Sequence, residues 1–528
     1  SRRAMRFSVL ARYALGIVAV LVLVTCFGDH MQQAGAVSRR APKSLGGGPA
    51  PPPRETAPSL REIAPASTEN MRRRDAVREA FVHSWTAYER FAWGHDELKP
   101  LTNTSNDVWG GFAVTMIDCL DTAKIMGLDA EFERMVAFLD TNFTMQRDHY
   151  VNVFELSIRV LGGLLGAFDL SGGDPRLLRM ADEAGTALLG AFPKDGDGLP
   201  AAELNIVKAH RRNHPWAGSN LAEVGSVQLE LGRLAAVLRA ARGAVPPRLE
   251  AASRSISHVL RERSSNGLYP RGLAGSESYA INGGADSFYE YLLKLWLIGG
   301  RKEASLWRAY TAAVKGIDEG LVHRIRPTAR QGQGPTVFVG ELQGASEVNV
   351  MEHLACFAPG MIALGVARGA GQLSPDEAAN HTRLATQLAE TCWRLYADTL
   401  TGLAPDTIRF EPEEGTYAMS HPKYSLRPET VESFFFLWRL TRDASWRERG
   451  WKIFGALQQQ CRTASGYAAL TDVRRRRSHE DSMPSFWMAE TLKYLYLLFA
   501  APEALPLDLR AHVLTTEAHI LPAAPLDA

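Results

Sequence analysis

The feature that most restricts the fold is a helical spacing of apolar residues that begins near Asp75 and continues to about Ala500. Further helices are predicted over 111–126, 130–141, 153–168, 176–192, 221–242, 247–261, 286–299, 303–316, 352–369, 375–398, 429–441, 445–460 and 485–500. The tail 513–521 is the best strand candidate, and no alternating run is long enough for a sheet-based domain. The pattern therefore predicts an all-α fold, with a closed helical toroid favoured over a bundle or solenoid.

The predicted helix over 153–168 carries a carboxylate in an almost wholly apolar segment. Glu155 and Arg159 are four residues apart, so they are neighbours on the helix surface. A buried ion pair that holds two helices together would explain them, and so would a functional site. Gly162-Gly163 weakens this helix and is tolerable where another backbone packs closely against it.

The N-terminal region has the pattern of a membrane anchor and a stem. Residues 1–12 are basic and are predicted to be a cytosolic tail, and residues 13–28 form an apolar signal-anchor segment. Residues 29–74 are rich in Pro and Gly and predict a stem that ends in a solvated run, Arg72-Arg-Arg74. A single folded domain is expected over 75–525. A signal peptide cleaved near Ala34-Gly-Ala36 is the alternative.

Carboxylates recur at the predicted starts of helices, beside aromatic residues. Asp286 and Glu290 share one such start, Glu429 and Glu432 another, and Glu490 follows Phe486 at a third. Each carboxylate alone would suit a helix N-terminus. If the helices surround a barrel, these starts gather at one mouth. Carboxyl groups and aromatic rings in one cavity are what a glycoside hydrolase needs, because rings stack on sugars and carboxyl groups protonate the leaving oxygen and activate water.

Composition adds two restrictions. The net charge is +1 and 46% of the residues are hydrophobic, a balance with no bias toward nucleic acid. Five cysteines are too few for a disulfide scaffold but enough for one bridge. Three glycosylation sequons begin at Asn103, Asn142 and Asn380.

Several stretches together resemble glycoside hydrolase family 47, the class I α-1,2-mannosidases. They include Ala92-Trp-Gly-His-Asp-Glu-Leu-Lys-Pro100, Asp118-Cys-Leu-Asp-Thr122, Phe154-Glu-Leu-Ser-Ile-Arg159, Ala222-Glu-Val-Gly-Ser226, Ala285-Asp-Ser-Phe-Tyr-Glu290, His353-Leu-Ala-Cys356, Leu426-Arg-Pro-Glu-Thr-Val-Glu432 and Thr515-Thr-Glu-Ala-His519. The resemblance covers about residues 75–521. It implies an (α/α)7 barrel with a C-terminal β-hairpin that plugs one end. It also implies a monomer that trims terminal α-1,2-linked mannose from high-mannose N-glycans with inversion.

The resemblance also implies roles for particular residues. Glu155 resembles the general acid and Glu429 the general base, while Asp286 is the rival candidate for the acid. An inverting pair is expected roughly 6.5–9.5 Å apart. Thr516 would ligate one Ca²⁺, and Cys356 and Cys392 would form the family's disulfide. Cys26 falls in the anchor, whereas Cys119 and Cys461 are expected to be free, buried thiols. The substrate-binding positions that match are Arg159, Glu290, His353, Arg427, Glu432, Phe486, Glu490 and Glu517.

Gly284 bears on specificity and location. The endoplasmic-reticulum members carry an arginine there that limits cleavage largely to one mannose. Gly284 therefore predicts broader, Golgi-like trimming by a type II Golgi membrane protein with a lumenal catalytic domain. An endoplasmic-reticulum enzyme that removes one mannose is the alternative. A degradation factor that recognises misfolded glycoproteins, and a pure lectin, are the other readings; the matched cysteines count against the first and the intact carboxylates against the second.

Overall fold

The computed structural model describes residues 67–523, except for 196–197, 214–218, 262–263, 265, 274, 326–335, 413, 502–504, 506–507 and 509. The predicted tail, the anchor with Cys26, and the stem up to residue 66 lie outside the described residues. Within the described ranges, no helix is both long and apolar enough to cross a membrane.

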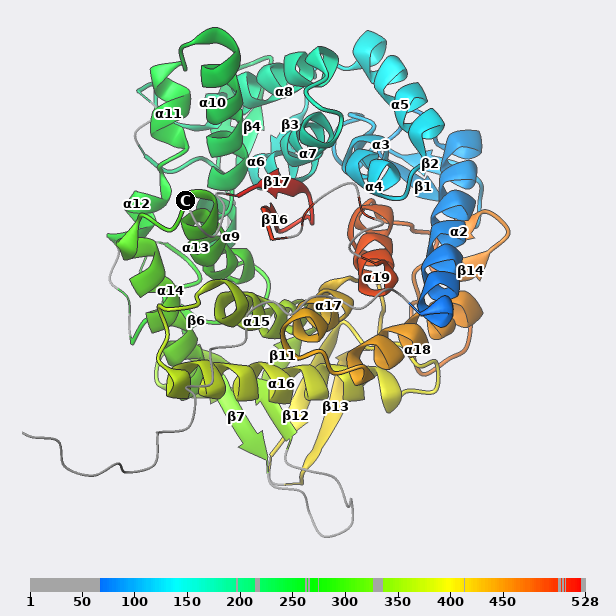
Figure 1. The fold of residues 1–528 in the computed structure, drawn as a ribbon, viewed down its shortest axis with the longest axis vertical. Coiled ribbons are helices and arrows are strands. Elements are labelled where there is room, and N and C mark those ends of the chain that lie inside the picture. Colours follow the sequence, from blue (N-terminus) through cyan, green and yellow to red (C-terminus); the bar gives the residue numbers. More distant parts are fainter. Residues whose placement is uncertain are drawn as a thin grey trace, which may run out of the picture. The chain divides into compact units, whose positions relative to one another are not determined.

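The helices form two concentric layers, with inner and outer helices alternating along the chain (Figure 1). The outer layer contains α2 (Thr68–Phe91), α5 (Asp129–Asn142), α8 (Pro175–Leu188), α11 (Pro247–Ala252) with α12 (Ile256–Leu260), α14 (Ala304–Gly316), α16 (Pro375–Ala397) and α18 (Ser445–Gln460). The inner layer contains α3 (Val114–Asp118) with α4 (Leu120–Ile125), α6 (Val153–Leu156) with α7 (Gly162–Leu170), α9 (Leu221–Gly225) with α10 (Gln228–Arg242), α13 (Asp286–Ile298), α15 (Ala358–Arg368), α17 (Glu429–Thr441) and α19 (Leu492–Phe499). The closed helical toroid predicted from the periodicity is confirmed.

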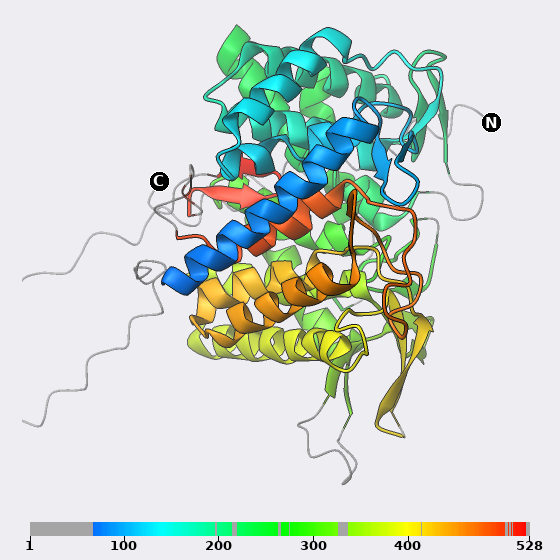
Figure 2. The same cartoon turned by 90° about the vertical axis from the view of Figure 1, so that its right-hand side faces the viewer.

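The apolar patterning explains which helices lie inside. Inner helix α19 is buried at every position from Leu492 to Phe499. Outer helix α16 buries a single stripe that includes Leu384, Leu388 and Leu395, and it exposes the opposite face. A helix that is apolar all round needs neighbours on every side, whereas an amphipathic helix can cover the outside. Figure 2 shows the first outer helix, α2, beside α19, so the layers close between the two ends of the described chain.

Close packing, as predicted, accounts for the glycine pair of the helix over 153–168. The segment runs from α6 through a π-helical turn, η1 (Ser157–Leu161), into α7. A Cβ on Gly163 would lie 2.6 Å from the carbonyl oxygen of Ile117, and one on Gly162 would lie 2.7 Å from the His519 ring. Only glycine allows α3 and the C-terminal hairpin to approach this closely.

The start of the first helix differs from the prediction. α2 begins at Thr68, where the Ser67 hydroxyl accepts a hydrogen bond from the Asn70 amide at 3.2 Å. The arginine run predicted to be solvated therefore lies inside α2. Arg73 is buried and donates to both carboxylate oxygens of Glu448 on α18, at 2.6 and 3.0 Å. The sequence could not show this burial, because the partner carboxylate lies 375 residues further along the chain.

The predicted helix over 221–242 is broken. α9 ends at Gly225 and α10 begins at Gln228. Ser226 leaves the helical conformation, with φ −133° and ψ 37°, and its hydroxyl donates to Ser287 of α13 at 2.8 Å. The Gln228 side chain donates to the Val224 carbonyl oxygen at 2.7 Å, so it replaces backbone hydrogen bonding at the break.

Small antiparallel sheets connect the helices, and these were not predicted. Most of their strands are too short to show alternation, whereas Thr407–Glu411 and Thr416–His421 have five and six residues and were missed. They pair β1 (Glu97–Lys99) with β2 (Thr104–Asn106); β3 (Tyr150–Asn152), β4 (Glu203–Asn205) and β5 (His210–Arg212); β6 (Ser278–Tyr279), β9 (Glu341–Gln343) and β10 (Ser346–Val348); β7 (Val322–Ile325) with β8 (Thr336–Val339); β11 (Val350–Glu352), β12 (Thr407–Glu411) and β13 (Thr416–His421); and β14 (Arg462–Thr463) with β15 (Gly466–Tyr467). Short 3₁₀ turns are η2 (Leu189–Ala191) and η4 (His353–Phe357), and further π-helical turns are η3 (Ile317–Leu321) and η5 (Trp487–Thr491).

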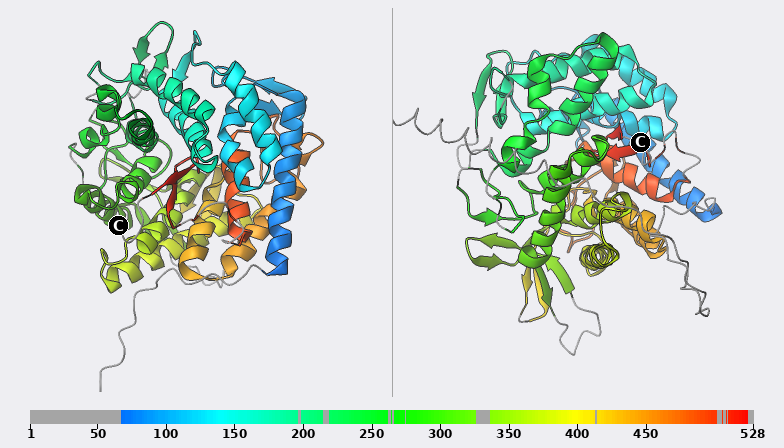
Figure 3. Two further views of the ribbon diagram at one scale, coloured as in Figure 1. Left: turned by 45° about the horizontal axis from the view of Figure 1, so that its top comes forward. Right: turned by 60° about the vertical axis from the view of Figure 1, so that its left-hand side comes forward.

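The C-terminal hairpin lies inside the ring of helices (Figures 1 and 3). β16 (His512–Leu514) pairs antiparallel with β17 (Ile520–Pro522), which confirms strand structure in the tail. Residues 515–519, predicted as part of a strand, form the turn between them. The hairpin is therefore the central element around which the inner helices are arranged.

Candidate active site

A cavity of about 460 Å³ opens at one end of the barrel. Its walls come from the N-terminal turns of inner helices: Glu155 from α6, Asp286 from α13, Glu429 from α17, and Glu490 from η5. The sequence predicted that, if the helices surround a barrel, these helix starts gather at one mouth. The structure shows this arrangement.

The turn of the C-terminal hairpin forms the floor of this cavity. Thr516 and Glu517 line it, and Thr516 is half-buried between buried neighbours. Two buried lysines hold the turn from below: Lys294 donates to the Thr515 carbonyl oxygen at 3.2 Å, and Lys493 donates to that of Ala518 at 2.7 Å. The carbonyl groups of a turn inside a protein need such donors, because water cannot reach them.

Arg159 links three carboxylates beneath the cavity. Its Nε donates to Glu155 Oε2 at 2.9 Å, and its Nη1 donates to Glu517 and lies 3.5 Å from Asp118 Oδ2. The guanidinium carbon lies 5.7 Å from the centre of the Phe486 ring. These carboxylates hold the pKa of Arg159 above its ordinary value despite its burial. The Glu155–Arg159 ion pair, one of the two readings of the sequence, is present, and both residues also line the cavity.

Glu429 is kept in its charged form. Burial opposes ionisation, but His353 and Arg427 outweigh it and hold the pKa of Glu429 below its usual value. His353 Nδ1 donates to Glu429 Oε2 at 2.7 Å, and its Nε2 lies 2.8 Å from the Tyr396 hydroxyl and 3.1 Å from the Thr430 hydroxyl. An ionised carboxylate only accepts hydrogen bonds, so Nδ1 of His353 carries a proton.

Asp286 has the opposite tendency. Burial raises its pKa to about 7, and the negative charges of Glu290, Glu352 and Glu429 act in the same direction. The backbone N–H of Ser287 donates to it at 2.9 Å and only partly offsets these effects. The cavity thus combines a carboxylate held ionised with a carboxyl group that carries a proton near neutral pH, the combination that acid–base catalysis requires.

The other carboxylates deep in the cavity are suited to a cation. Burial raises the pKa of Glu432, Glu490 and Glu517, and repulsion from neighbouring carboxylates adds to it. They lie in one cavity with the hydroxyl and carbonyl oxygens of Thr516. Such an all-oxygen set fits a hard divalent cation such as Ca²⁺. In the described part of the chain, no group of three or more His, Cys, Asp or Glu side chains is placed to hold a metal directly.

The structure brings nearly all of the predicted site residues together. Those that line the cavity are Glu155, Asp286, Glu429, Arg159, Glu290, Arg427, Glu432, Phe486, Glu490, Thr516 and Glu517. His353 is buried, does not line the cavity and contacts Glu429, which does.

Sequence reasoning missed part of the cavity wall. Glu97, Trp109, Asn220 and Glu223 also line it. Glu97 stands in a quoted motif, and burial raises its pKa. Asn220 and Glu223 form a capping box at the start of α9. Glu223 also stands in a quoted motif, whereas the pattern around Asn220 was readable only as helix capping.

The cysteines agree with the predictions. Cys356 and Cys392 form a disulfide that joins η4 to α16. Cys119 and Cys461 are free and buried.

Comparisons with known proteins agree on one family. The model of glycosyl hydrolase family 47 matches residues 80–523. A mannosyl-oligosaccharide 1,2-alpha-mannosidase of Arabidopsis thaliana is 37% identical over 472 residues, covering 87% of this chain and 80% of that protein. The endoplasmic reticulum mannosyl-oligosaccharide 1,2-alpha-mannosidase of Mus musculus is 37% identical over 468 residues, covering 85% and 68%. The structure of alpha-1,2-mannosidase from Trichoderma reesei matches with a TM-score of 0.76 and 27% identity, covering 88% of this chain and all of that one.

Proposed function

Because this chain belongs to glycosyl hydrolase family 47, we propose that it is a mannosyl-oligosaccharide 1,2-alpha-mannosidase that removes terminal α-1,2-linked mannose from high-mannose N-glycans. The observation that carries the proposal is the cavity at the barrel mouth, where carboxyl groups of opposite pKa tendency face one space beside the ring of Phe486. The sevenfold form of the barrel is part of the proposal and is supported by the alternation of inner and outer helices.

The proposed reaction is a single displacement with inversion. Glu429, held ionised by His353 and Arg427, takes a proton from the attacking water. Either Glu155 or Asp286 delivers a proton to the leaving oxygen. The pKa of Asp286 near 7 supports it as the group that is protonated at neutral pH. Glu155 is the acid that the family resemblance favours, and it would then act through a water.

We assign Ca²⁺ to the cavity floor. Thr516 would supply its carbonyl and hydroxyl oxygens, and waters held by Glu290, Glu432, Glu490 and Glu517 would complete the shell. The ion supplies a fixed positive charge that orients the sugar hydroxyl groups. The hairpin turn that Lys294 and Lys493 hold in place positions Thr516 for this role.

Two specificities are proposed, and the structure offers an argument for each. Gly284 at the cavity wall leaves room for several branches, which supports Golgi-like trimming of several mannoses. However, a Cβ on Gly284 would lie only 3.4 Å from Nε of Arg271. A cation therefore stands near this position without a side chain at residue 284. This observation favours the second candidate, an enzyme that stops after one mannose.

The location follows as a further part of the proposal. A signal-anchor over residues 13–28 would place a monomeric catalytic domain in the lumen of the secretory pathway, with the Golgi membrane favoured over the endoplasmic reticulum.

The test is a mass-spectrometric time course of a high-mannose N-glycan with the full chain in Ca²⁺. Loss of several hexoses supports the proposal with Golgi-like trimming. Arrest after one hexose supports the second specificity, and Arg271→Met should then release the arrest. The matched control is Arg308→Met, which changes an exposed arginine of α14.

Two further arms complete the design. EDTA should abolish hydrolysis and added Ca²⁺ should restore it, whereas full activity without metal would contradict the calcium assignment. A folded chain that binds the glycan but releases no hexose would refute the enzyme and leave the glycoprotein-recognition reading.

A further inference from the structure

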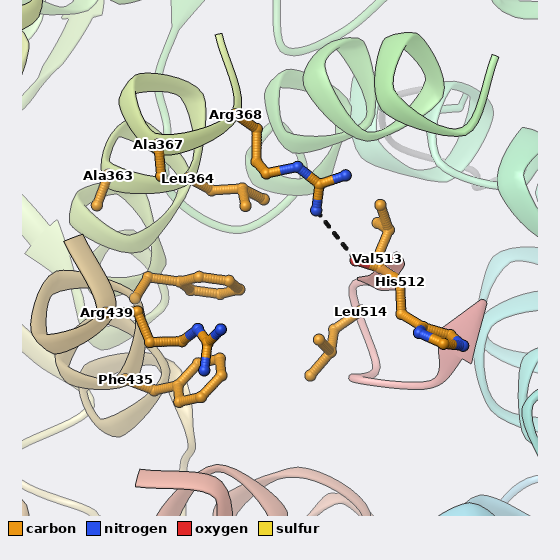
Figure 4. A pocket seen from close by; sticks show the side chains of 10 residues that line it. Ala363, Leu364, Ala367, Arg368, Phe435, Arg439, His512, Val513 and Leu514 are labelled. Atoms are coloured by element: carbon orange, nitrogen blue, oxygen red, sulfur yellow. Dashed lines mark hydrogen bonds between the residues drawn. The ribbon is translucent and has the colours of Figure 1, made fainter. Parts of the chain in front are cut away.

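A second, smaller cavity lies on the other side of the hairpin from the active site. Its volume is about 30 Å³, and its walls come from α15, α17 and β16 (Figure 4). Most of the lining is apolar, including Leu364, Phe435 and Leu514. Two arginines, Arg368 and Arg439, also line it. The cavity shares no lining residue with the active site.

Arg368 is a buried cation with unused donors. It is only 3% exposed. Its Nη1 donates to the carbonyl oxygen of His512 at 3.4 Å, the bond drawn in Figure 4. Its Nε and Nη2 have no hydrogen-bond partner among the residues that the structure describes. These two nitrogens form one edge of the guanidinium group, the edge that binds two oxygens of one oxyanion side by side.

Arg439 brings a second positive charge to the same cavity. Its guanidinium carbon lies 5.6 Å from the centre of the Phe435 ring, and the described residues give it no ion pair. The pKa values of Arg368 and Arg439 are lowered to about 10, chiefly by burial and also by a neighbouring arginine, Arg301 for the first and Arg442 for the second.

Asp508, the carboxylate that interacts electrostatically with both arginines, already forms hydrogen bonds with another arginine. Asp508 favours the charged form of each, but from a distance. Its two oxygens accept hydrogen bonds from Arg510, both at 3.2 Å. The described residues around the cavity therefore leave its positive charge without a close counterion.

The positions of the two arginines in their helices explain why positive charge is favoured there. They do not explain why two donors of Arg368 are unused. Arg368 is the last residue of α15 and Arg439 lies in the last turn of α17, where the helix dipole favours cations. A dipole supplies no acceptor for Nε and Nη2 of Arg368. A buried cation with unpaired donors is costly unless an anion accompanies it.

We propose that this cavity binds one small oxyanion of the sulfate or phosphate class, held between Arg368 and Arg439. The apolar walls and the small volume exclude sugars and nucleotides. The bound ion would neutralise the cavity and tie α15 and α17 to strand β16. Its role is to stabilise the hairpin that carries the active-site floor, and the proposal does not depend on the sugar chemistry.

The experiment measures thermal unfolding of the full chain during a sodium sulfate titration from zero to 10 mM, with sodium chloride added to keep ionic strength constant. Sulfate avoids precipitation of calcium. A ligand that binds only the folded state raises Tm in a saturable manner. We expect a saturable rise of roughly 1–3 °C for the wild type. The matched control Arg383→Met, which changes an exposed arginine of α16, should show the same rise.

Arg368→Met should abolish the rise. In sulfate-free buffer this variant should be at least as stable as the wild type, because it removes a buried charge that lacks a counterion. If Arg368 only clamps β16, the variant is destabilised equally at every sulfate concentration, which would overturn the proposal. Should Arg368→Met fail to fold, Arg439→Met must weaken the sulfate midpoint at least tenfold. A flat titration for the wild type, or an equal response to chloride alone, would also overturn it.

Discussion

Replacing Lys493 by methionine is the most direct test of how the hairpin is held. Lys493 and Asp121 are both fully buried, and the ammonium group lies 2.9 and 3.0 Å from the two carboxylate oxygens. It also donates to the Ala518 carbonyl oxygen at 2.7 Å. Without Lys493, Asp121 keeps its contact with His519 Nδ1 at 3.3 Å but loses the ammonium group that touches both of its oxygens. Removing one member of a buried ion pair costs about 3–5 kcal/mol. We therefore expect Lys493→Met to lower the free energy of unfolding by about that amount.

The assay is urea unfolding at pH 7, compared with a surface pair in the same region. Lys124 and Asp129 lie 2.5 Å apart, but their side chains are 27% and 69% exposed. Lys124→Met should cost at most about 1 kcal/mol. The double variant Asp121→Asn with Lys493→Met should cost clearly less than the sum of its single variants, because neither charge is then left alone. A cost for Lys493→Met no greater than that for Lys124→Met would refute the reasoning.

Three further predictions follow from the buried groups. Burial raises the pKa of Glu230 to about 7, so its contribution to stability is full below pH 4.5 and is lost as the pH rises through 7. Relative to the wild type, Glu230→Gln should gain about 3 kcal/mol between pH 4 and pH 8 in urea unfolding, and a constant difference would contradict this. Cys392→Ser removes a disulfide with a sequence separation of 36 and should lower the free energy of unfolding by about 4 kcal/mol. A reduced wild type that is as stable as the oxidised wild type would contradict this. If Asp286 is the acid, kcat/KM should fall as the pH rises through about 7, and a profile that is flat to pH 8.5 would exclude it.

The local pattern predicted the helices well, because a buried stripe on a helix recurs every three to four residues and can be read from neighbours in sequence. It predicted the helix starts that carry Glu155, Asp286 and Glu429, and the close packing at Gly162-Gly163. It did not predict the short sheets, since most of their strands have only two to four residues and show no period, and it missed the longer pair β12 and β13. The break between α9 and α10 also escaped, because Ser226 is held by Ser287 on another helix.

The sequence by itself determined the helical layers, the carboxylates at their starts and, through its motifs, the family. Tertiary structure decided which of these charges meet. Arg159 reaches Glu517 across 358 residues, and Arg73 reaches Glu448 across 375. It also placed His353 behind Glu429 and the side chain of Arg368 at a cavity. The charge state of a carboxylate or an arginine depends on burial and on partners within a few ångströms, and no periodicity along the chain encodes those.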